Sequence, residues 1–296
     1  MNQEPAASSP DVGPGDRLRT APSTAAPSSA AGRTPDATNA TLIAREDLTD
    51  TLSIVRVRPD SGRVPAFVPG QFVRLGVPRG PHPEIGPGGR VRLIRRAYSI
   101  ASSPLETAFL EFFVVRIDEG ALTPRLWEIE PPGRLWMDEQ AKGEFHLDLA
   151  PPGCNLVMVS TGTGIAPFVS MLRTFRGQGR WRRFILINGV RYACDLGYRE
   201  ELEAAARTDA TVGYVPIASR EPEGSRWTGL RGRVQSVLDD AVLERVAGVR
   251  LDPADCHVFL CGNPEMILSV QALLEARGFV TDDRNRPGNI HFERYW

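Results

Sequence analysis

Between Thr41 and Leu149, the apolar residues come in short runs that are separated by turn-forming residues. The run Thr51–Val57 alternates between apolar and polar positions, and Phe112 and Phe113 lie in another run rich in strand-forming residues. Several strands with few helical stretches favour an antiparallel barrel or sandwich. The predicted elements are strands at Thr51–Val57, Gln71–Val77, Arg92–Ala101, Ala108–Arg116 and Glu144–Leu149, a short helix at Thr123–Trp127 and a long loop at Pro78–Gly89.

After Pro151 and Pro152 the pattern changes, because short apolar runs now alternate with longer helical segments. Such alternation predicts βαβ units and a parallel sheet, so this half should be a doubly wound α/β domain. The predicted strands are Asn155–Ser160, Arg183–Val190, Thr211–Ala218 and Cys256–Cys261, and the predicted helices are Pro167–Phe175, Arg199–Arg207, Val234–Val246 and Pro264–Arg277.

The length of 296 residues corresponds to about two domains at roughly 150 residues each. Of the first 40 residues, 27 are Ala, Ser, Pro, Thr or Gly, which cannot bury enough apolar surface to offset the entropy of ordering. An organelle transit peptide is the alternative, although the acidic residues of this stretch are out of place in one. We therefore expect a disordered tail at 1–40, a β domain at 41–150 and an α/β domain at 151–296.

Composition narrows the class of protein. The 35 basic and 36 acidic residues nearly cancel, which gives no support to nucleic acid as a partner. The chain has neither an apolar run of membrane-spanning length nor a secretory signal pattern, so we expect a cytoplasmic monomer without membrane insertion. Its four cysteines lack C-x-x-C spacing and its four histidines are scattered, so neither a disulfide framework, nor a metal site, nor an in-chain iron–sulfur cluster is predicted.

The strongest local signal is the run T-G-T-G-I-A-P at Thr161–Pro167, which follows the first strand of the α/β half. Gly162 and Gly164 leave the backbone uncovered, so a phosphate could approach the amides of the turn and the start of the next helix. The third glycine of the usual dinucleotide fingerprint is replaced by Pro167, which suits a first helical turn. A plain strand-to-helix turn is the alternative, and the flanking strand and helix favour a nucleotide-binding loop.

Arginines indicate which nucleotide binds there. About 20 residues past the first glycine, an NAD-binding enzyme has an Asp or Glu that binds the ribose 2′-hydroxyl. The corresponding strand of this chain ends in Asn-Gly-Val-Arg at Arg191 and offers no acidic residue. Arg220 follows the next strand, and Arg231 and Arg233 come soon after. Guanidinium groups offer forked donors to phosphate oxygens, so this rim favours NADP over NAD.

In the β half, Arg96, Ala97, Tyr98 and Ser99 follow one another on a predicted strand. Alternation along a strand places Arg96 and Tyr98 on one face, with Ala97 and Ser99 on the other. This tetrapeptide, the Thr161–Pro167 loop, the run C-G-N-P-E-M at Cys261 and the terminal E-R-Y-W recur in one order from Thr41 to Trp296. Together they resemble the ferredoxin–NADP reductase family, and the bacterial ferredoxin/flavodoxin reductases above all.

The resemblance implies a six-stranded antiparallel Greek-key barrel that binds FAD, followed by an NADP-binding α/β domain. It also implies roles for individual residues. In the flavin site it places Arg96 at the pyrophosphate, Tyr98 on the ring and Ser99 near the reactive N5, with further contacts from Ala97, Phe113, Val114, Val115, Arg116, Ala121, Leu122, Thr123 and Thr163. In the NADP site it places Gly162, Gly164, Arg191, Arg220, Arg233 and Glu265. The residues implied for catalysis are Ser99, Cys261, Tyr295 and Trp296, of which Tyr295 or Trp296 would cover the flavin.

The implied activity is that of a ferredoxin/flavodoxin–NADP reductase, in which NADPH gives a hydride to flavin N5 and single electrons pass to ferredoxin or flavodoxin. The alternatives are an NAD(P)H reductase of free flavin, cytochrome or an oxygenase partner, and a nucleotide-binding regulatory module without turnover. Two features depart from the family: the loop Pro78–Gly89 is longer, and the N-terminal extension has no usual counterpart.

Overall fold

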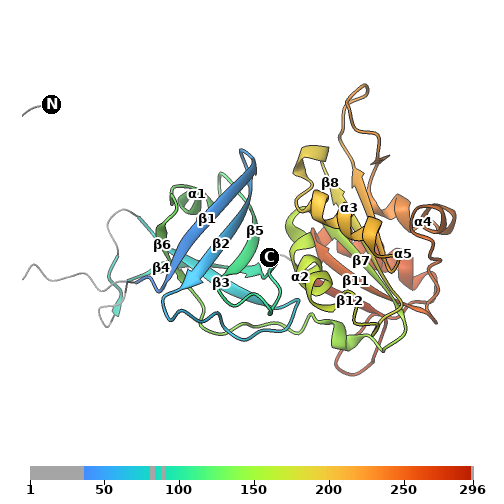
Figure 1. Ribbon diagram of the computed structural model, residues 1–296, viewed down its shortest axis with the longest axis horizontal. Helices are drawn as coiled ribbons and strands as arrows, with labels where there is room; N and C mark the ends of the chain where they lie inside the picture. The colour runs from blue at the N-terminus through green and yellow to red at the C-terminus, as the bar shows by residue number, and fades with distance from the viewer. Residues whose placement is uncertain (1–36, 81–83, 88–90, 295–296) are drawn as a thin grey trace, which may run out of the picture. The chain divides into compact units, whose positions relative to one another are not determined.

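The computed structural model describes residues 37–80, 84–87 and 91–294 of the chain. Residues 1–36 of the predicted tail, parts of the predicted loop Pro78–Gly89, and both Tyr295 and Trp296 lie outside the described residues. The described chain forms a β-barrel followed by an α/β domain (Figure 1).

The barrel is a six-stranded antiparallel sheet in the order β4-β3-β6-β1-β2-β5. The Ala101 amide, just past β4, donates to the Glu111 carbonyl of β5 at 2.8 Å and so links the two outer strands. Fifteen buried apolar residues, Phe112 and Leu75 among them, fill the interior. The strands are β1 (Ala40–Thr49), β2 (Leu52–Pro59), β3 (Phe72–Pro78), β4 (Leu93–Ser99), β5 (Leu110–Val115) and β6 (Gly133–Met137), with helix α1 at Thr123–Trp127.

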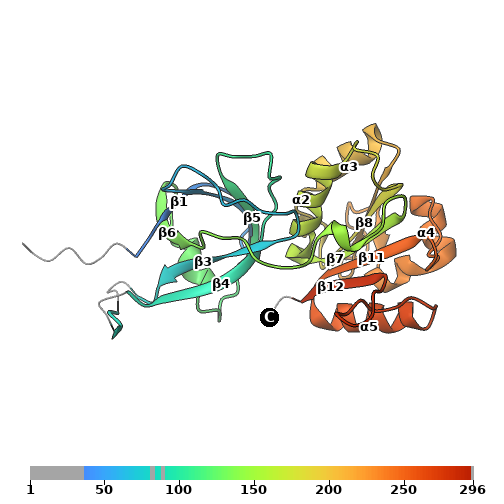
Figure 2. The same ribbon diagram turned by 90° about the horizontal axis from the view of Figure 1, so that it is seen from below.

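The α/β domain has a parallel sheet in the order β10-β9-β8-β7-β11-β12, with helices on both faces (Figure 2). Alternating residues of the central strands enter two cores, one shared with α2 and α3 and the other with α4 and α5. The strands are β7 (Asn155–Thr161), β8 (Arg183–Val190), β9 (Val212–Ala218), β10 (Leu230–Arg231), β11 (Cys256–Gly262) and β12 (Ile290–Arg294). The helices are α2 (Ala166–Phe175), α3 (Arg199–Thr208), α4 (Asp240–Ala247) and α5 (Pro264–Glu275).

The predicted fold class is confirmed, and the prediction for α1 matches its observed bounds. The predicted strand Glu144–Leu149 is wrong, because Phe145 and Leu147 pack into the core shared with the α/β domain and Leu147–Leu149 forms a 3₁₀ turn. The predicted helix Val234–Val246 is divided, since the Asp239 side chain accepts hydrogen bonds from two amides and starts α4 afresh. The sequence patterns missed β1, β6, the two-residue strand β10, and β12.

In the part of the chain that the structure describes, no helix combines the length and the apolar character needed to cross a bilayer.

Candidate functional site

The centre of the α/β sheet is the point where the strand order reverses. The strands β7 and β11 lie side by side there, and the chain leaves their carboxyl ends toward α2 and α5. Ligands of open α/β sheets bind outside the carboxyl ends of the strands at such a switch point. The loops after β7 and β11, at Thr161–Pro167 and Cys261–Met266, are therefore brought together as one site.

The two glycines of the first loop serve different purposes. Gly162 has φ +54°, and a Cβ on it would meet no atom within 4 Å, so its side of the loop is open. A Cβ on Gly164 would lie 2.3 Å from the carbonyl oxygen of Cys261, so this glycine allows close packing against β11. Thr161 Oγ1 accepts a hydrogen bond from the Asn263 amide at 2.9 Å. The loop is thus open beside its first glycine, and its second glycine allows it to pack closely against β11.

The predicted NADP arginines gather at the same edge of the sheet. Arg191 follows β8, Arg220 lies two residues past β9 and Arg233 two residues past β10, and all three side chains are exposed. The Arg220 amide donates to the Arg191 carbonyl at 2.8 Å, which fixes the spacing of the first two backbones. Arg231 instead donates to loop carbonyls, including that of Glu221 at 2.7 Å, so it stabilises the loop. The other three form a cationic rim suited to phosphate.

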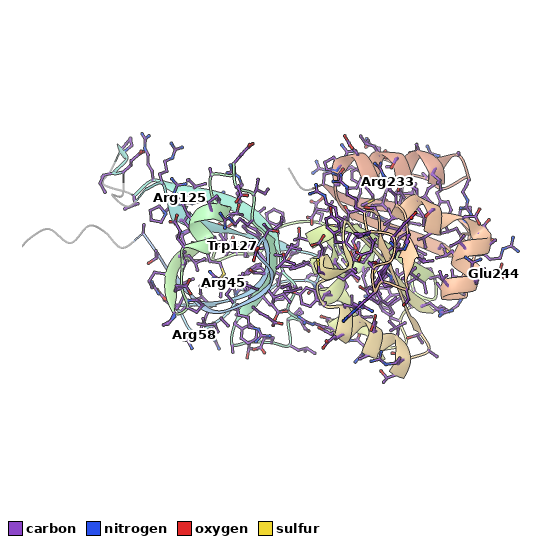
Figure 3. All side chains as sticks on the ribbon, turned by 90° about the horizontal axis from the view of Figure 1, so that it is seen from above. Arg45, Arg58, Arg125, Trp127, Arg233 and Glu244 are labelled. Carbon is purple, nitrogen blue, oxygen red and sulfur yellow. The ribbon has the colours of Figure 1, made fainter. Side chains whose placement is uncertain are left out.

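A second cationic site lies on the barrel, in a hollow of about 620 Å³. Arg96 of β4 and Ala121, just before α1, both line it, as the resemblance implies for a flavin pyrophosphate site. Arg125 belongs to α1 (Figure 3) and was not predicted from the sequence, although its place two residues after Thr123 is a signal that could have found it. The lining residues are Arg79, Glu84, Leu93, Ile94, Arg95, Arg96, Ala121 and Arg125.

Tyr98 lies two residues from Arg96, on the barrel face expected from alternation. Its ring meets Phe112 edge-on, with centroids 6.4 Å apart and planes at 68°. Burial raises the pKa of its hydroxyl, and the charge of Arg96 opposes this shift. One side of the Tyr98 ring thus packs against the barrel core, and a ring held in this way is suited to stacking on a flat ligand ring.

Several predicted flavin contacts have buried side chains. Phe113 packs its ring against Tyr198 at 5.6 Å, and Val114 and Leu122 belong to the barrel core. Thr123 Oγ1 accepts from the Ile117 amide and so serves the turn before α1. The side chains of these four residues are buried and do not line the hollow. Among the remaining predicted contacts, Ala97 of β4 is exposed, Val115 packs against the core shared with the α/β domain, and Arg116 pairs with Asp118 at 2.8 Å.

Ser99 Oγ donates a hydrogen bond to Glu293 Oε2 at 3.1 Å, across 194 positions of sequence. Burial raises the pKa of Glu293 to about 7, while the hydrogen bond from Ser99 works in the opposite direction. Glu293 lies opposite Cys261 in the pairing of β12 with β11. Cys261 is buried and Thr163 lies in the adjoining turn, whereas Glu265 is exposed at the start of α5. The structure therefore adds Glu293, which the sequence analysis did not select as a site residue.

The histidines are not all scattered, contrary to the impression from the sequence. His257 Nδ1 and His291 Nε2 are 3.0 Å apart on neighbouring strands β11 and β12, and their rings are stacked. Burial lowers the pKa of His291 to about 4, and the nearby Asp282 carboxylate opposes this shift. No group of three His, Cys, Asp or Glu side chains that could hold a metal occurs among the described residues. The pair is therefore a neutral element of the core.

Comparisons with known proteins agree with this geometry. Residues 158–272 match the model of the oxidoreductase NAD-binding domain. The chain is 36% identical over 234 residues to the flavodoxin/ferredoxin–NADP reductase of Escherichia coli strain K12, covering 78% of this chain and 88% of that protein. It is 35% identical over 258 residues to ferredoxin–NADP reductase B of Sorangium cellulosum, covering 86% and 96%. A ferredoxin–NADP⁺ reductase structure from Neisseria gonorrhoeae, with bound FAD and NADP, superposes with a TM-score of 0.75 at 28% identity, covering 88% and 98%.

Proposed function

Because this chain belongs to the flavodoxin/ferredoxin–NADP reductase family, we propose that it is an FAD-dependent oxidoreductase that moves electrons between NADPH and a one-electron protein carrier. The observation that carries this function is the hydrogen bond between Ser99 of the barrel and Glu293 of the α/β domain. This bond supports the proposal because Glu293 lies opposite Cys261, beside the carboxyl ends of β7 and β11, where a nicotinamide would bind.

The residues of the barrel fit FAD. Four arginines and one glutamate line the hollow, so the site is net cationic and suits a pyrophosphate. Arg96 would hold the pyrophosphate, with Arg125 and the backbone at Ala121 beside it. Tyr98 would stack on the flavin ring, and Ser99 would donate a hydrogen bond to it.

The residues of the α/β domain fit NADP(H). The open side of Gly162 and the start of α2 can receive the pyrophosphate through backbone amides. Arg191, Arg220 and Arg233 would hold the nucleotide phosphates, with Arg220 and Arg233 at the 2′-phosphate. Thr163, Cys261 and Glu265 would lie around the nicotinamide.

A bound flavin would supply the conversion between the two-electron hydride of NADPH and single electrons. The chain supplies placement and a path for protons. Ser99 Oγ can give its proton to Glu293 and take one from a group bound beside it, so the pair forms a two-link route. Tyr295 or Trp296 would cover the flavin until nicotinamide displaces it.

The experiment that tests the function is reduction of the purified chain by NADPH. We expect bound FAD with visible absorbance, bleaching of that absorbance by NADPH, and electron transfer to ferredoxin or flavodoxin that is faster than to free flavin. A chain that carries no flavin and takes none up on reconstitution would refute the proposal. Equal rates with free flavin would favour the alternative of a free-flavin reductase, and bound flavin that NADPH does not bleach would favour a regulatory module.

Replacing Arg220 and Arg233 by Ala should weaken use of NADPH far more than use of NADH. Each lost charge-assisted hydrogen bond to the 2′-phosphate is worth about 1.5–3 kcal/mol, so KM for NADPH should rise by about 10- to 100-fold for each variant. Arg231→Ala is the matched control, since its side chain is bound to loop carbonyls. Steady-state kinetics with both nucleotides measure the effect, and equal changes for NADPH and NADH would contradict the assignment.

Ferredoxin or flavodoxin is the proposed partner, in keeping with the names of the relatives. The four cysteines are free thiols, and this fits the reducing conditions of the cytoplasm, where we place the protein.

A further inference from the structure

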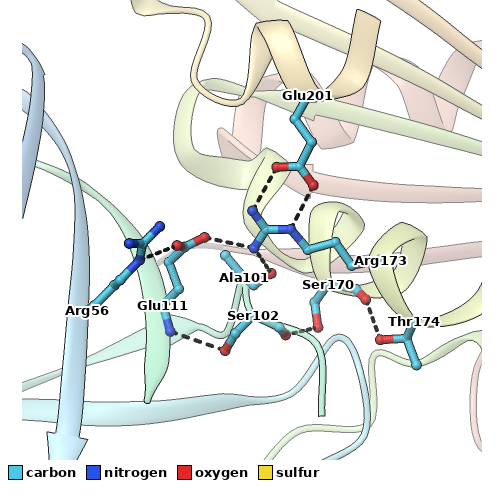
Figure 4. Close-up of polar contacts among 8 residues, drawn as sticks. All are labelled: Arg56, Ala101, Ser102, Glu111, Ser170, Arg173, Thr174 and Glu201. Carbon is cyan, nitrogen blue, oxygen red and sulfur yellow. Dashed lines mark hydrogen bonds and ion pairs between the residues drawn. The ribbon is translucent and has the colours of Figure 1, made fainter. Parts of the chain in front are cut away.

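A buried carboxylate lies between the barrel and the α/β domain. Glu111 of β5 has a side chain only 3% exposed, and it accepts from Arg56 Nε at 2.9 Å and from Arg173 Nη1 at 2.7 Å (Figure 4). Arg56 belongs to the barrel, whereas Arg173 belongs to α2 of the α/β domain. A buried carboxylate between two guanidinium groups depends on both of them. The ion pair of Glu111 and Arg173 therefore joins the two domains.

Arg173 is held in a defined orientation. Its Nη1 also donates to the Ala101 carbonyl at 3.0 Å, and its Nε and Nη2 bind both oxygens of Glu201 on α3. Its guanidinium lies over the ring of Tyr198, 5.2 Å from the centroid. Burial opposes the charge of Arg173, but the contacts with Glu201 and Glu111 outweigh it and raise its pKa. The cation stays charged and fixed at the junction.

A second link runs beside the first. Ser170 Oγ, one turn before Arg173 on α2, donates to the Ser102 carbonyl at 2.6 Å, and Ser102 Oγ in turn accepts from the Glu111 amide at 3.1 Å (Figure 4). Two side chains of one helix thus bind the segment Ala101–Ser102 of the barrel. We define the interdomain clamp as Ser102, Glu111, Ser170 and Arg173, together with the Ala101 carbonyl.

The clamp lies between the proposed flavin site and the proposed nicotinamide site. The segment Ala101–Ser102 begins two residues after Ser99, the proposed partner of the flavin ring. Helix α2 begins directly after the Gly162–Ile165 turn, which packs on Cys261 and faces the proposed nicotinamide site. Ser170 and Arg173 lie five and eight residues past Ile165, the last residue of that turn, which is about 8 and 12 Å along the helix. A rigid helix fixed at one end to the flavin side determines where the nicotinamide side lies.

We propose that Arg173 and Glu111 are positioning residues that set the approach of nicotinamide to flavin by clamping α2 to the segment after Ser99. This rests on the proposed function. Hydride transfer needs reacting atoms about 3–3.5 Å apart, and a displacement of about 1 Å can cost about 100-fold in rate. The proposed NADP arginines lie elsewhere, after β8, β9 and β10, so loosening the clamp should slow transfer without weakening nucleotide binding.

The test compares the FAD-loaded variants Glu111→Gln and Arg173→Gln with Glu201→Gln. Glu201→Gln removes a carboxylate charge on the α/β side only, and its amide oxygen can still accept one of the two hydrogen bonds that hold Arg173, so it is the matched control. We expect the rate of flavin bleaching by saturating NADPH to fall by about 10- to 100-fold in the first two and to stay within about twofold in the control. The dissociation constant of NADP⁺ should change by less than about twofold in all three. Arg173→Lys, which keeps the charge but not the fork, should recover only part of the rate.

A readout independent of turnover is hydrogen exchange of the FAD-loaded protein without nucleotide. Amides of 100–111 and 166–175 should exchange faster in Glu111→Gln than in Glu201→Gln, while those of β1 and α5 should not change. If Glu111→Gln does not fold, Ser170→Ala tests the second link and should slow bleaching by several-fold. Equal losses in Glu111→Gln and Glu201→Gln, or loss of rate in step with loss of NADP⁺ affinity, would overturn the clamp. Failure of the unmodified protein to be bleached by NADPH would instead overturn the proposed function.

Discussion

Replacing Ser99 by Ala should lower turnover with a one-electron acceptor by about 100-fold, the low end of the range for a lost proton-transfer group. The reason is that Ser99 Oγ would link a group bound on the barrel to Glu293 Oε2, to which it donates a hydrogen bond of 3.1 Å. Glu293→Gln keeps the shape of the carboxyl group but cannot accept the proton, so turnover should fall by a similar factor in this variant. Stopped-flow oxidation of the reduced protein by ferredoxin or flavodoxin measures both variants.

The double variant separates a shared route from two independent effects. If Ser99 and Glu293 belong to one proton route, the oxidation rate of the double variant should fall no further than that of either single variant, because each single substitution already interrupts the route. Additive losses would contradict the relay. Ser61→Ala, an exposed serine of the barrel that lies outside this pair, is the control.

The same pair predicts a pH dependence. Burial raises the pKa of Glu293 to about 7 from its ordinary value of 4.5, so the carboxyl is protonated below pH 7 and can accept a proton above it. Electron delivery should therefore rise as pH rises through about 7, and Glu293→Gln should flatten that step. The folded chain holds this proton between pH 4.5 and 7 while the unfolded chain has released it, so the contribution of Glu293 to stability falls as pH rises through that window.

Replacing Arg96 by Ala should weaken FAD binding by about 10- to 100-fold, because a charge-assisted hydrogen bond to a phosphate is worth about 1.5–3 kcal/mol. Arg96 lines the 620 Å³ hollow with Ala121 and Arg125. Arg58→Ala is the control, since Arg58 is an exposed barrel arginine on β2 that does not line the hollow (Figure 3).

Titration of the FAD-free variants with FAD, followed by flavin fluorescence, measures this effect. The melting temperature gives a second measure, because a ligand that binds only the folded chain stabilises it by mass action. At one FAD concentration, the melting temperature should rise less in Arg96→Ala than in Arg58→Ala. The same FAD affinity in both variants would remove Arg96 from the pyrophosphate site.

Local sequence patterns correctly predicted the strands and helices on which the motifs lie. The Thr161–Pro167 loop follows a buried strand and opens a helix, as predicted, and the tetrapeptide at Arg96 lies on β4. Alternation correctly predicted that Arg96 and Tyr98 share a face, because the period of a strand is a property of the backbone alone. The predicted bounds of α1 match the observed ones, and Pro124 in its first turn suits the start of a helix.

The missed strands show where local patterns fail. The strand β1 pairs with both β2 and β6, and β12 pairs with β11 at the edge of its sheet. Their residues resemble loops by composition, and pairing with a distant strand stabilises them. Conversely, Phe145 and Leu147 alternate like a strand, but their burial comes from the α/β domain and not from a strand partner.

The sequence by itself determined the two kinds of domain, the glycine loop, the strand that carries the tetrapeptide at Arg96 and the arginines at the strand ends, because each depends on neighbours a few residues apart. Only the tertiary structure decided that Ser99 meets Glu293, that Gly164 packs on Cys261 while Gly162 stays open, and that Glu111 binds Arg173. These contacts join residues 62 to 194 positions apart, or two glycines that look alike in sequence. They depend on the order of strands in the sheets and on how the barrel meets α2, and neither is encoded in the spacing of residues along the chain.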